Sequence, residues 1–501
     1  MRITCIAIFI MASLGAFAQK TANPKPYAKI ITVDDLKKNL YIIAGDEMEG
    51  RETATEGQRK AAAFIEDYFK SIGLKPGNNG NYQMTFPVYI DSLVNSSIVV
   101  NDEAFSRNED FSFVISSNHS ASYNFGEVVF AGFGISDSTR NDYRDIDAKG
   151  KLVVVLSPDM AGEPSPQNRR GFNFFTQQEA AMKNGAAALF VVNAKINPME
   201  DKSNMYVNAF QRSVRINTFF VSEKIARAIM KDSYDAVKTA TLNKSAASKS
   251  FGANVSVDLQ KQRLTLQSSN VLGLLEGTDL RDEFVVISAH YDHLGIRKGV
   301  IWYGADDDGS GTVSILQIAK AFAKAKADGK GPRRSILFMA VSGEEKGLWG
   351  SDYYGANPVY PLEKTSVNLN VDMIGRIDPS RTYGDSTNYV YVIGDDKLSS
   401  DLKPISESIN KKNTKLELDY KYNDPKDPQR IYYRSDHYNF AKRGVPIIFY
   451  FSGLHADYHK PTDTPDKINY DLMRKRAQLI FYTGWEMANR KDMLKRDIPL
   501  N

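Results

Sequence analysis

Apolar runs alternate with amphipathic segments along the C-terminal half of the chain. Short runs rich in β-branched and aromatic residues predict strands at Phe284–Ala289, Ser335–Val341, Ser366–Val371 and Val445–Phe451. Apolar residues spaced three and four positions apart predict helices near Thr312–Ala327, Asp401–Asn410 and Met473–Ala488. Strands that alternate with helices predict an α/β domain whose mostly parallel, mixed sheet is covered by helices on both faces.

The N-terminal part of the chain is also helical in pattern. Helices are predicted at Val33–Leu40 and Gln58–Ile72, and Thr55 stands at the N-cap position of the second. Because 501 residues exceed what one compact core normally supports, a second domain is expected. We expect residues 19–95 and 260–501 to form one α/β domain in two pieces.

Residues 96–259 have a different pattern of apolar and polar residues and interrupt this domain. The strand-like runs here are short and separated by polar residues; the clearest are Gly126–Phe130, Lys151–Leu156, Ala187–Val192 and Thr218–Val221. One helix is predicted at Thr176–Asn184, and a polar surface loop at Lys238–Ser250. The stretch is therefore predicted to be a β-rich inserted domain.

The first eighteen residues predict a secretory signal peptide. A basic start is followed by an apolar run, Ile3 to Phe17, and the small residues Ala16 and Ala18 frame a cleavage site. The run is too short to span a bilayer comfortably, so no membrane span is expected. The only cysteine, Cys5, lies inside this segment, so disulfides are not expected to stabilise the mature chain. We expect a secreted or periplasmic protein. The net charge of +4 is small for this length and is uninformative about nucleic acid. The basic residues are scattered without an arginine-rich block, so no nucleic-acid partner is expected.

Acids and imidazoles follow three of the predicted strands. His290 and Asp292 end the first, Glu344 and Glu345 follow the second, and Asp372 ends the third. In open α/β sheets the carboxyl ends of the strands form the ligand crevice. Five of the six histidines also fall in two short segments of the chain. So many carboxylates in one crevice would repel one another unless cations lay among them, so a site for two metal ions is predicted.

Five motifs in order carry a family resemblance. They are His290-Tyr291-Asp292, Gly304 to Gly311 (GADDDGSG), Glu344-Glu345, Asp372 and His459 to Thr464 (HKPTDT). This set is similar to the M28 aminopeptidase family of co-catalytic zinc exopeptidases, closely over residues 270–471 and loosely over 40–86. The resemblance implies the zinc exopeptidase type of fold and two Zn²⁺ ions per chain.

The resemblance also implies a metal-ligand set. Asp307 would bridge the two ions, His290 and Asp372 would complete the ligands of one, and Glu345 and His459 those of the other. Imidazole nitrogen and carboxylate oxygen are the ligands that catalytic zinc takes in proteins, with a position left open for water. Two such ions can polarise a carbonyl and activate a water molecule together.

Two further acids receive catalytic roles from the resemblance. Glu344 would be the general base, and Asp292 would orient His290 from behind. The resemblance also implies a cis peptide bond after Asp307. The flanking Asp306 and Asp308 are expected to satisfy backbone donors at the N-terminus of the following helix.

The remaining candidate groups are expected to be structural. His293 and His455 could touch substrate, but solvated or structural roles are expected for them. The contiguous Ser435-Asp436-His437 lacks the Gly-x-Ser-x-Gly turn of a serine hydrolase, so it is predicted to support the wall of the site. The inserted domain is similar to a protease-associated domain over Phe133 to Val155 and Glu179 to Ala186, which implies no catalysis.

The function expected is a secreted dizinc aminopeptidase that removes N-terminal residues from peptides with a free N-terminus. A carboxypeptidase of the same superfamily is the nearest alternative, because Arg430 and Arg434 could bind a C-terminal carboxylate. A glutaminyl cyclase would depart from the Asp-Asp-Asp-Gly-Ser-Gly pattern. A non-catalytic binding protein on this fold would have lost ligands, whereas all five metal positions here carry competent residues.

Overall fold

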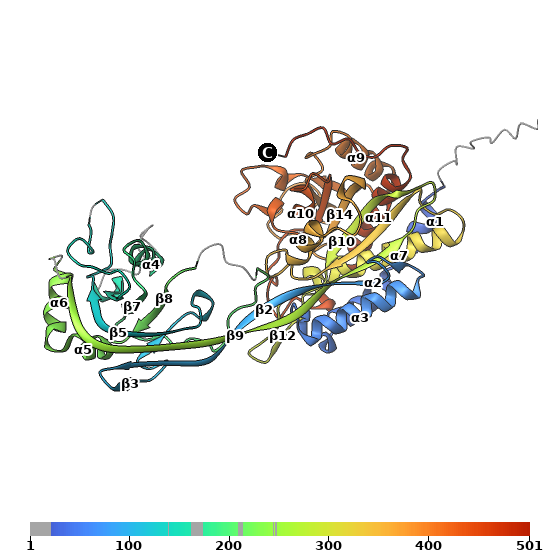
Figure 1. The fold of residues 1–501 in the computed structure, drawn as a ribbon. Helices are drawn as coiled ribbons and strands as arrows, with labels where there is room; N and C mark the ends of the chain where they lie inside the picture. The colour runs from blue at the N-terminus through green and yellow to red at the C-terminus, as the bar shows by residue number, and fades with distance from the viewer. Residues whose placement is uncertain are drawn as a thin grey trace, which may run out of the picture. The chain divides into compact units, whose positions relative to one another are not determined.

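The computed structural model describes residues 22–138, 140–161, 174–208, 214–243, 245 and 248–500 (Figure 1). The chain divides into two compact units. The first runs to Phe86 and resumes at Ser268, and the second is Pro87–Gln267. The predicted signal peptide, residues 1–18, lies outside the described residues.

A mixed sheet forms the centre of the first unit. Its strands, in spatial order, are β16 (Glu417–Asp419), β15 (Tyr389–Ile393), β17 (Ile447–Phe451), β14 (Thr365–Val371), β10 (Leu280–His290), β13 (Arg334–Val341), the C-terminal part of β9 (Lys249–Leu275) and β1 (Lys75–Pro76). The four strands β17, β14, β10 and β13 are parallel, whereas β9 runs antiparallel to β13. Strand β10 lies between β13 and β14, so their carboxyl ends meet at one edge.

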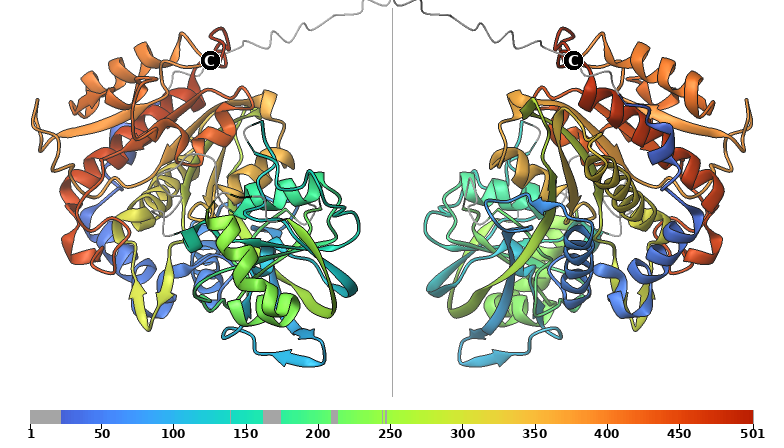
Figure 2. Two further views of the ribbon diagram at one scale, coloured as in Figure 1. Left: turned by 90° about the vertical axis from the view of Figure 1, so that its left-hand side faces the viewer. Right: turned by 90° about the vertical axis from the view of Figure 1, so that its right-hand side faces the viewer.

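Helices cover both faces of this sheet. Val285, Ile287 and Ala289 of β10 face one core, and the intervening Val286 faces the other. The first core is completed by α1 (Lys25–Ala28), α2 (Val33–Ile43), α3 (Glu56–Ser71), α7 (Gly311–Ala327), α9 (Leu402–Asn413) and α11 (Tyr470–Asn489). The second core is completed by α8 (Trp349–Ala356) and α10 (His437–Ala441). Figure 2 shows α9 and α11, in orange and red, side by side. The predicted fold class is confirmed.

The second unit also contains a sheet with helices on both faces. Its strands are the N-terminal part of β9, β5 (Ala121–Phe130), β6 (Leu152–Leu156), β7 (Ala188–Val192), β8 (Asn217–Val221) and β4 (Phe111–Ser112), and beside them β2 (Gln83–Val100) pairs with β3 (Glu103–Phe105). Strands β5 to β8 are parallel neighbours. Helix α4 (Phe174–Lys183) packs on one face, and α5 (Glu223–Met230) and α6 (Tyr234–Leu242) pack on the other.

Helices α5 and α6 correct the prediction of a single helix in the inserted domain. Residues Lys238 to Leu242, predicted as surface loop, lie in α6, and Lys249 and Ser250 lie in β9. The polar composition was misleading because Val237 and Thr241, one turn apart, face the core while Lys238 pairs with Glu223 at 2.9 Å. A narrow buried stripe is enough to hold such a helix.

The unit boundaries fall nine and eight residues outside the predicted insertion of 96–259. Strand β2 continues through Phe86 and strand β9 continues through Ser268 without interruption. A continuous strand carries no turn or change in composition at which a boundary could be recognised. Near the edge of the first unit, β11 (Gly295–Arg297) and β12 (Val300–Trp302) form a small hairpin.

Candidate metal centre

Three adjacent strands place the predicted ligands. His290 is the last residue of β10, and it pairs in register with Val341, the last residue of β13. Glu344 and Glu345 follow β13 within four residues, and Asp372 follows β14 directly. A short irregular turn, Ala305–Ser310, leads into α7 and brings Asp307 to the same edge. The predicted ligands on these segments therefore converge. The fifth predicted ligand, His459, joins them from the loop after β17.

One half of the donor cluster surrounds His290. Its Nε2 atom lies 3.3 Å from Asp307 Oδ1, 3.6 Å from Asp372 Oδ1 and 3.9 Å from Glu344 Oε2. All four side chains are buried or nearly so. These donors form one group that could hold a cation.

The other ring nitrogen of His290 contacts a main-chain carbonyl. His290 Nδ1 lies 3.1 Å from the main-chain carbonyl of Asp292, and a carbonyl only accepts hydrogen bonds. Nδ1 must therefore carry the proton, which leaves the Nε2 lone pair facing the acids in the neutral ring. Asp292 thus contacts His290 as predicted, but through its carbonyl, since its carboxylate lies 3.9 Å from Nδ1.

The other half of the cluster surrounds Glu345. His459 Nε2 lies 3.1 Å from Asp307 Oδ2 and 3.0 Å from Glu345 Oε2. Glu345 Oε1 lies 2.8 Å from His293 Nδ1. The two oxygens of Asp307 therefore face different halves of the cluster, which is the position a bridging carboxylate requires. Burial lowers the pKa of His459, but hydrogen bonds to Asp307 and Glu345 outweigh it and raise that pKa to about 10.

His293 is the donor that the sequence did not place. It was expected to be solvated or structural, yet its ring is fully buried among the acids of the second half. Its Nδ1 atom also lies 3.9 Å from Asp307 Oδ2. The available signal was its position directly after Asp292, on the loop that His290 begins.

Buried polar atoms without hydrogen-bond partners mark the same region. They include His290 Nε2, His293 Nε2 and Asp372 Oδ1. Buried polar atoms normally have a partner, so a cluster of orphaned ones requires an explanation. Two donor groups, one centred on His290 and one on His293, each fit a cation that takes nitrogen and oxygen ligands.

The acids that flank Asp307 clamp the segment after Asp372. Asp308 Oδ1 accepts from Met373 N at 2.9 Å, and Asp306 Oδ1 accepts from Gly375 N at 2.6 Å. Asp308 Oδ1 also accepts from Gly311 N, at the start of α7, as predicted for a helix N-terminus. Asp306 differs from that prediction, because its carboxylate serves the Asp372 loop. The two acids thus fix two ligand loops to one another.

A further acid, Asp463, holds the main chain at Asp307. Asp463 Oδ2 accepts from the main-chain nitrogens of Asp306 at 3.0 Å and Asp307 at 3.2 Å. His455 Nε2 lies 3.2 Å from Asp306 Oδ2, so this buried histidine has the structural role that was one of its two predicted options. The peptide bond between Asp307 and Asp308 is cis, as the resemblance implied.

The Ser435-Asp436-His437 run contacts a predicted ligand without lining the cavity, and its serine and histidine bond to different groups. Ser435 Oγ donates to Asp372 Oδ2 at 2.7 Å. His437 Nε2 donates to the carbonyl of Tyr432 at 2.7 Å, and burial lowers the pKa of this histidine to about 3. The serine therefore orients a predicted metal ligand, and the histidine stays neutral and remote from it.

A cavity of about 30 Å³ opens onto the acids of the first half. Its charged side is formed by Asp307, Glu344 and Asp372, and its apolar wall by Met373, Ile431, Phe449, Phe451 and Leu454. Arg434 and Tyr458 complete the lining, and Arg434 Nη2 donates to Tyr458 Oη at 3.1 Å. The Tyr458 ring stacks on His459, with centroids 3.9 Å apart, which the sequence did not reveal.

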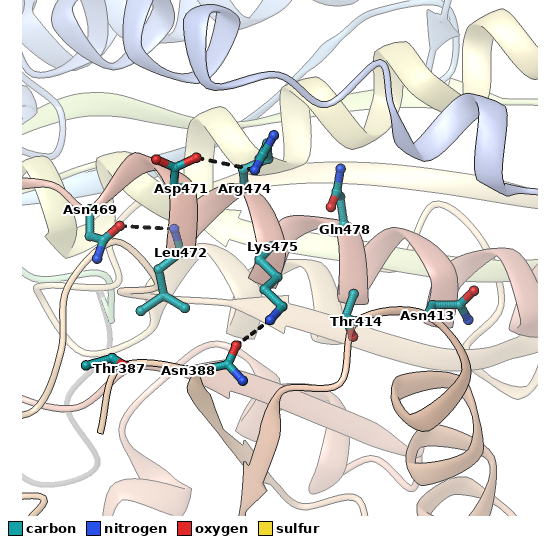
Figure 3. Close-up of a pocket in the computed structure, with 10 residues that line it drawn as sticks. All are labelled: Thr387, Asn388, Asn413, Thr414, Asn469, Asp471, Leu472, Arg474, Lys475 and Gln478. Atoms are coloured by element: carbon teal, nitrogen blue, oxygen red, sulfur yellow. Dashed lines mark hydrogen bonds and ion pairs between the residues drawn. The ribbon is translucent and has the colours of Figure 1, made fainter. Parts of the chain in front are cut away.

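A larger hollow, of about 470 Å³, lies at the N-terminal end of α11 (Figure 3). None of its ten lining residues is a histidine, and its one acid, Asp471, pairs with Arg474 at 3.3 Å. Lys475 donates to Asn388 across the hollow (Figure 3). This polar surface therefore lacks the imidazoles and clustered carboxylates of the metal centre.

Imidazoles and carboxylates gathered at the carboxyl ends of parallel strands define a metal centre of the kind that metallohydrolases use. Residues 270–484 match the model of peptidase family M28. Over these residues the chain is similar to that family, and they include all five predicted metal ligands.

Two relatives and one solved structure show the extent of the similarity. The chain is 22% identical over 353 residues to aminopeptidase YwaD of Bacillus subtilis, covering 69% of this chain and 64% of that protein. It is 36% identical over 124 residues to a vacuolar membrane protease of Tuber melanosporum, covering 24% of this chain and 12% of that protein. The chain therefore spans less than two thirds of either relative. The structure of an aminopeptidase from Aneurinibacillus sp. strain AM-1 has the same fold, with a TM-score of 0.52, 17% identity, and coverage of 95% of this chain and 99% of that one.

Proposed function

We propose that the chain is a dizinc aminopeptidase that removes N-terminal residues from peptides. The observation that carries this proposal is the position of Asp307, whose two carboxylate oxygens face separate groups of metal-ligand side chains. A single ion would not need both groups. The name of the Bacillus subtilis relative agrees with this activity for that protein.

The residues that would hold the ions are those of the two halves. His290 and Asp372 would bind one, Glu345 and His459 the other, and Asp307 both. Zinc ions in such a pair supply a Lewis acid for the substrate carbonyl and lower the pKa of a water molecule. Ser435 would keep the Asp372 carboxylate in orientation, because its hydroxyl donates to Oδ2.

Glu344 is proposed as the general base. Its carboxylate borders the cavity. Burial raises the pKa of Glu344 well above its usual value, and the Asp372 and Glu345 charges raise it further against the opposing effect of His290. A raised pKa suits a carboxylate that takes a proton from the attacking water and returns it to the leaving amine.

The substrate proposed is a peptide with a free, positively charged N-terminus and an apolar first residue. The acids at the cavity attract an ammonium group. The facing wall of Ile431, Phe449 and Phe451 offers an apolar surface to the adjacent side chain.

A carboxypeptidase remains the second candidate because Arg434 borders the cavity. Arg430, the other arginine considered, lines a different hollow and lies over the Tyr433 ring at 4.9 Å. Only one of the two cations is thus placed to meet a substrate carboxylate.

A peptide panel distinguishes these candidates. Purified protein would be incubated with one leucine-initiated peptide in free, N-acetylated and C-amidated forms, with and without a chelator. We expect hydrolysis of the free and C-amidated forms, none of the N-acetylated form, and loss of activity with the chelator. Release of C-terminal residues from the N-acetylated peptide would overturn the proposal in favour of the carboxypeptidase.

The number of ions has its own test. Elemental analysis of protein dialysed against buffer with trace zinc should give two zinc atoms per chain. A value of one at saturation would contradict the bridging role of Asp307.

Export to the periplasm or medium is proposed from the signal-like residues 1–18. No helix among the described residues is long and apolar enough to cross a bilayer. N-terminal sequencing of protein recovered after export should begin near Gln19. Exported protein that still begins with Met1 would contradict the proposed cleavage.

The second unit is proposed to be a protease-associated module without a catalytic role. Both metal-ligand groups found among the described residues belong to the first unit. His119 is the single histidine of the second unit. Its main-chain nitrogen donates to Asn217 Oδ1, and its carbonyl accepts from Asn217 Nδ2. The module would thus not perform the chemistry.

A further inference from the structure

Three consecutive residues near the N-terminus contact the loops that carry the metal centre. Arg51, Glu52 and Thr53 lie more than two hundred residues before the segment that matches the peptidase family. They follow a turn in which Glu49 and Gly50 have positive φ, and they precede helix α3. Both Arg51 and Thr53 are fully buried.

Thr53 holds the carboxylate of Asp292. Its Oγ1 atom lies 2.7 Å from Asp292 Oδ2, and the hydroxyl must donate because an ionised carboxylate only accepts. The other oxygen, Asp292 Oδ1, accepts from the main-chain nitrogen of Glu344 at 3.2 Å. Asp292 is itself fully buried, so Thr53 is one of the few donors that can reach it.

Asp292 links Thr53 to two residues of the first half of the donor cluster, His290 and Glu344. Its carbonyl accepts from His290 Nδ1, which sets the orientation of the imidazole. Its carboxylate accepts from Glu344 N, which sets the position of the proposed base. A shift of Asp292 would therefore move a ligand and the base together.

Arg51 ties the neighbouring loops together. Its guanidinium donates to the carbonyls of Tyr291 and Tyr303, each at 2.7 Å, and of Gly304 at 2.9 Å. The first of these flanks His290 and the last precedes the Asp306–Asp308 turn. In return, the carbonyl of Arg51 accepts from His293 N at 3.1 Å.

Glu52 reaches the third loop. Its Oε1 atom lies 2.6 Å from Lys346 Nζ, directly after Glu345. One tripeptide thus contacts the segments after β10, before α7 and after β13.

We infer that Thr53 is a positioning residue of the metal centre, acting through Asp292 on His290 and Glu344. The inference rests on the proposed metal-dependent function. Groups that orient metal-bound imidazoles typically change metal affinity or activity by about 10–100-fold when they are removed. We assign this effect to the hydroxyl of Thr53 and not to its methyl group.

The test compares variants that separate the hydroxyl from the methyl group. Thr53→Val keeps the shape and removes the donor, and Thr53→Ser keeps the donor. Thr55→Val is the matched control, because the Thr55 hydroxyl donates at 2.6 Å to the carbonyl of Glu52 within the same segment. Zinc affinity is measured by competition with a chromophoric chelator, alongside kcat, KM and the melting temperature of the metal-free protein.

We expect Thr53→Val to weaken zinc binding or to lower kcat by about 10–100-fold with little change in KM. Thr53→Ser and Thr55→Val should stay within about threefold of the wild type. Wild-type zinc affinity and kcat in Thr53→Val would overturn the inference, and so would an equal loss in Thr53→Ser.

Two further readouts keep the test decisive. If Thr53→Val does not fold, Thr53→Ala against Thr53→Ser makes the same comparison of hydroxyl present and absent. Zinc affinity needs no substrate, so it reports on Thr53 even if the protein cleaves no peptide. Failure of the peptide panel would then count against the proposed function alone.

Discussion

Glu344 and Glu345 are neighbours in sequence, yet their carboxylates lie in different halves of the donor cluster. Glu344 Oε2 is 3.9 Å from His290 Nε2. Glu345 Oε1 is 2.8 Å from His293 Nδ1, and its Oε2 is 3.0 Å from His459 Nε2. The backbone after β13 therefore sends two identical functional groups to different halves of the donor cluster.

The first prediction concerns Glu345→Ala. This change removes one predicted ligand of the second half, so bound zinc should fall from two atoms to about one per chain at limiting free zinc. Elemental analysis after dialysis measures it. Two tightly bound zinc atoms in this variant would show that Glu345 is not required as a ligand.

The second prediction concerns Glu344→Gln. The amide keeps the shape of the side chain and leaves every predicted ligand in place, but it cannot accept a proton. We expect two zinc atoms per chain and a loss in kcat of at least about 10²–10⁴-fold. Near-wild-type turnover by the zinc-loaded variant would transfer the role of base to another group.

The third prediction concerns substrate preference. The apolar wall formed by Ile431, Phe449 and Phe451 should favour leucine over aspartate at the first position by more than about tenfold in kcat/KM. Two tripeptides that differ only at that residue measure the ratio. Introducing a charge at the wall, as in Ile431→Glu, should reduce the preference. Equal rates for both peptides in the wild type would remove this wall from the substrate site.

The strands were the part of the structure most readable from the sequence. Observed strand β14 begins one residue before the predicted one, and β13 likewise, because continuous β-branched runs bounded by polar residues identify buried strands. The expectation that His290 and Asp372 lie at one edge follows from the same reasoning, since parallel strands bring their carboxyl ends together. The role of Asp307 came from the family resemblance alone.

Contacts between distant segments were not readable in this way. The approach of Thr53 to Asp292 spans 239 positions in the chain, and no local pattern marks it. The burial of His293 depends likewise on Glu345, which another strand delivers. Helix α5 was missed although Ile225 and Ile229 form a stripe, because the surrounding polar residues suggested a β-rich texture.

The fourth prediction concerns the pH dependence of stability. Asp395 is fully buried; burial raises its pKa to about 7, and the Asp396 charge contributes. The carboxyl is thus neutral in the folded state below about pH 7 but ionises near pH 3.8 when unfolded. The free energy of unfolding of the wild type should therefore decrease, because of this group, as the pH rises from about 4 to 7.

Asp395→Asn removes that dependence while retaining an oxygen for Asn423 Nδ2, which donates to Oδ1 at 3.1 Å. The variant should gain stability relative to the wild type by roughly 2–4 kcal/mol between pH 4 and pH 8. Urea unfolding of both metal-free proteins at the two pH values gives the difference. A difference that does not change with pH would show that Asp395 ionises normally in the fold.

The fifth prediction concerns removal of the second unit. A chain in which a two-residue Asn-Gly turn replaces residues 87–267 should fold and bind two zinc atoms, because the predicted ligands all lie in the first unit. Its preference among longer peptides should change. Elemental analysis and a peptide length series test both statements, and a folded deletion protein without zinc would contradict the first.

Strands β2 and β9, which pair with one another, connect the second unit to the first. Leu272 N donates to the carbonyl of Tyr82 in the first unit, and Asn101 N donates to that of Asn254 in the second. The chain thus leaves and re-enters the first unit on neighbouring strands, while the ligand-bearing strands β10, β13 and β14 are uncut. An insertion attached in this manner can be lengthened, exchanged or lost during evolution without interrupting the segments that build the metal centre, so the two units can diverge in sequence at separate rates.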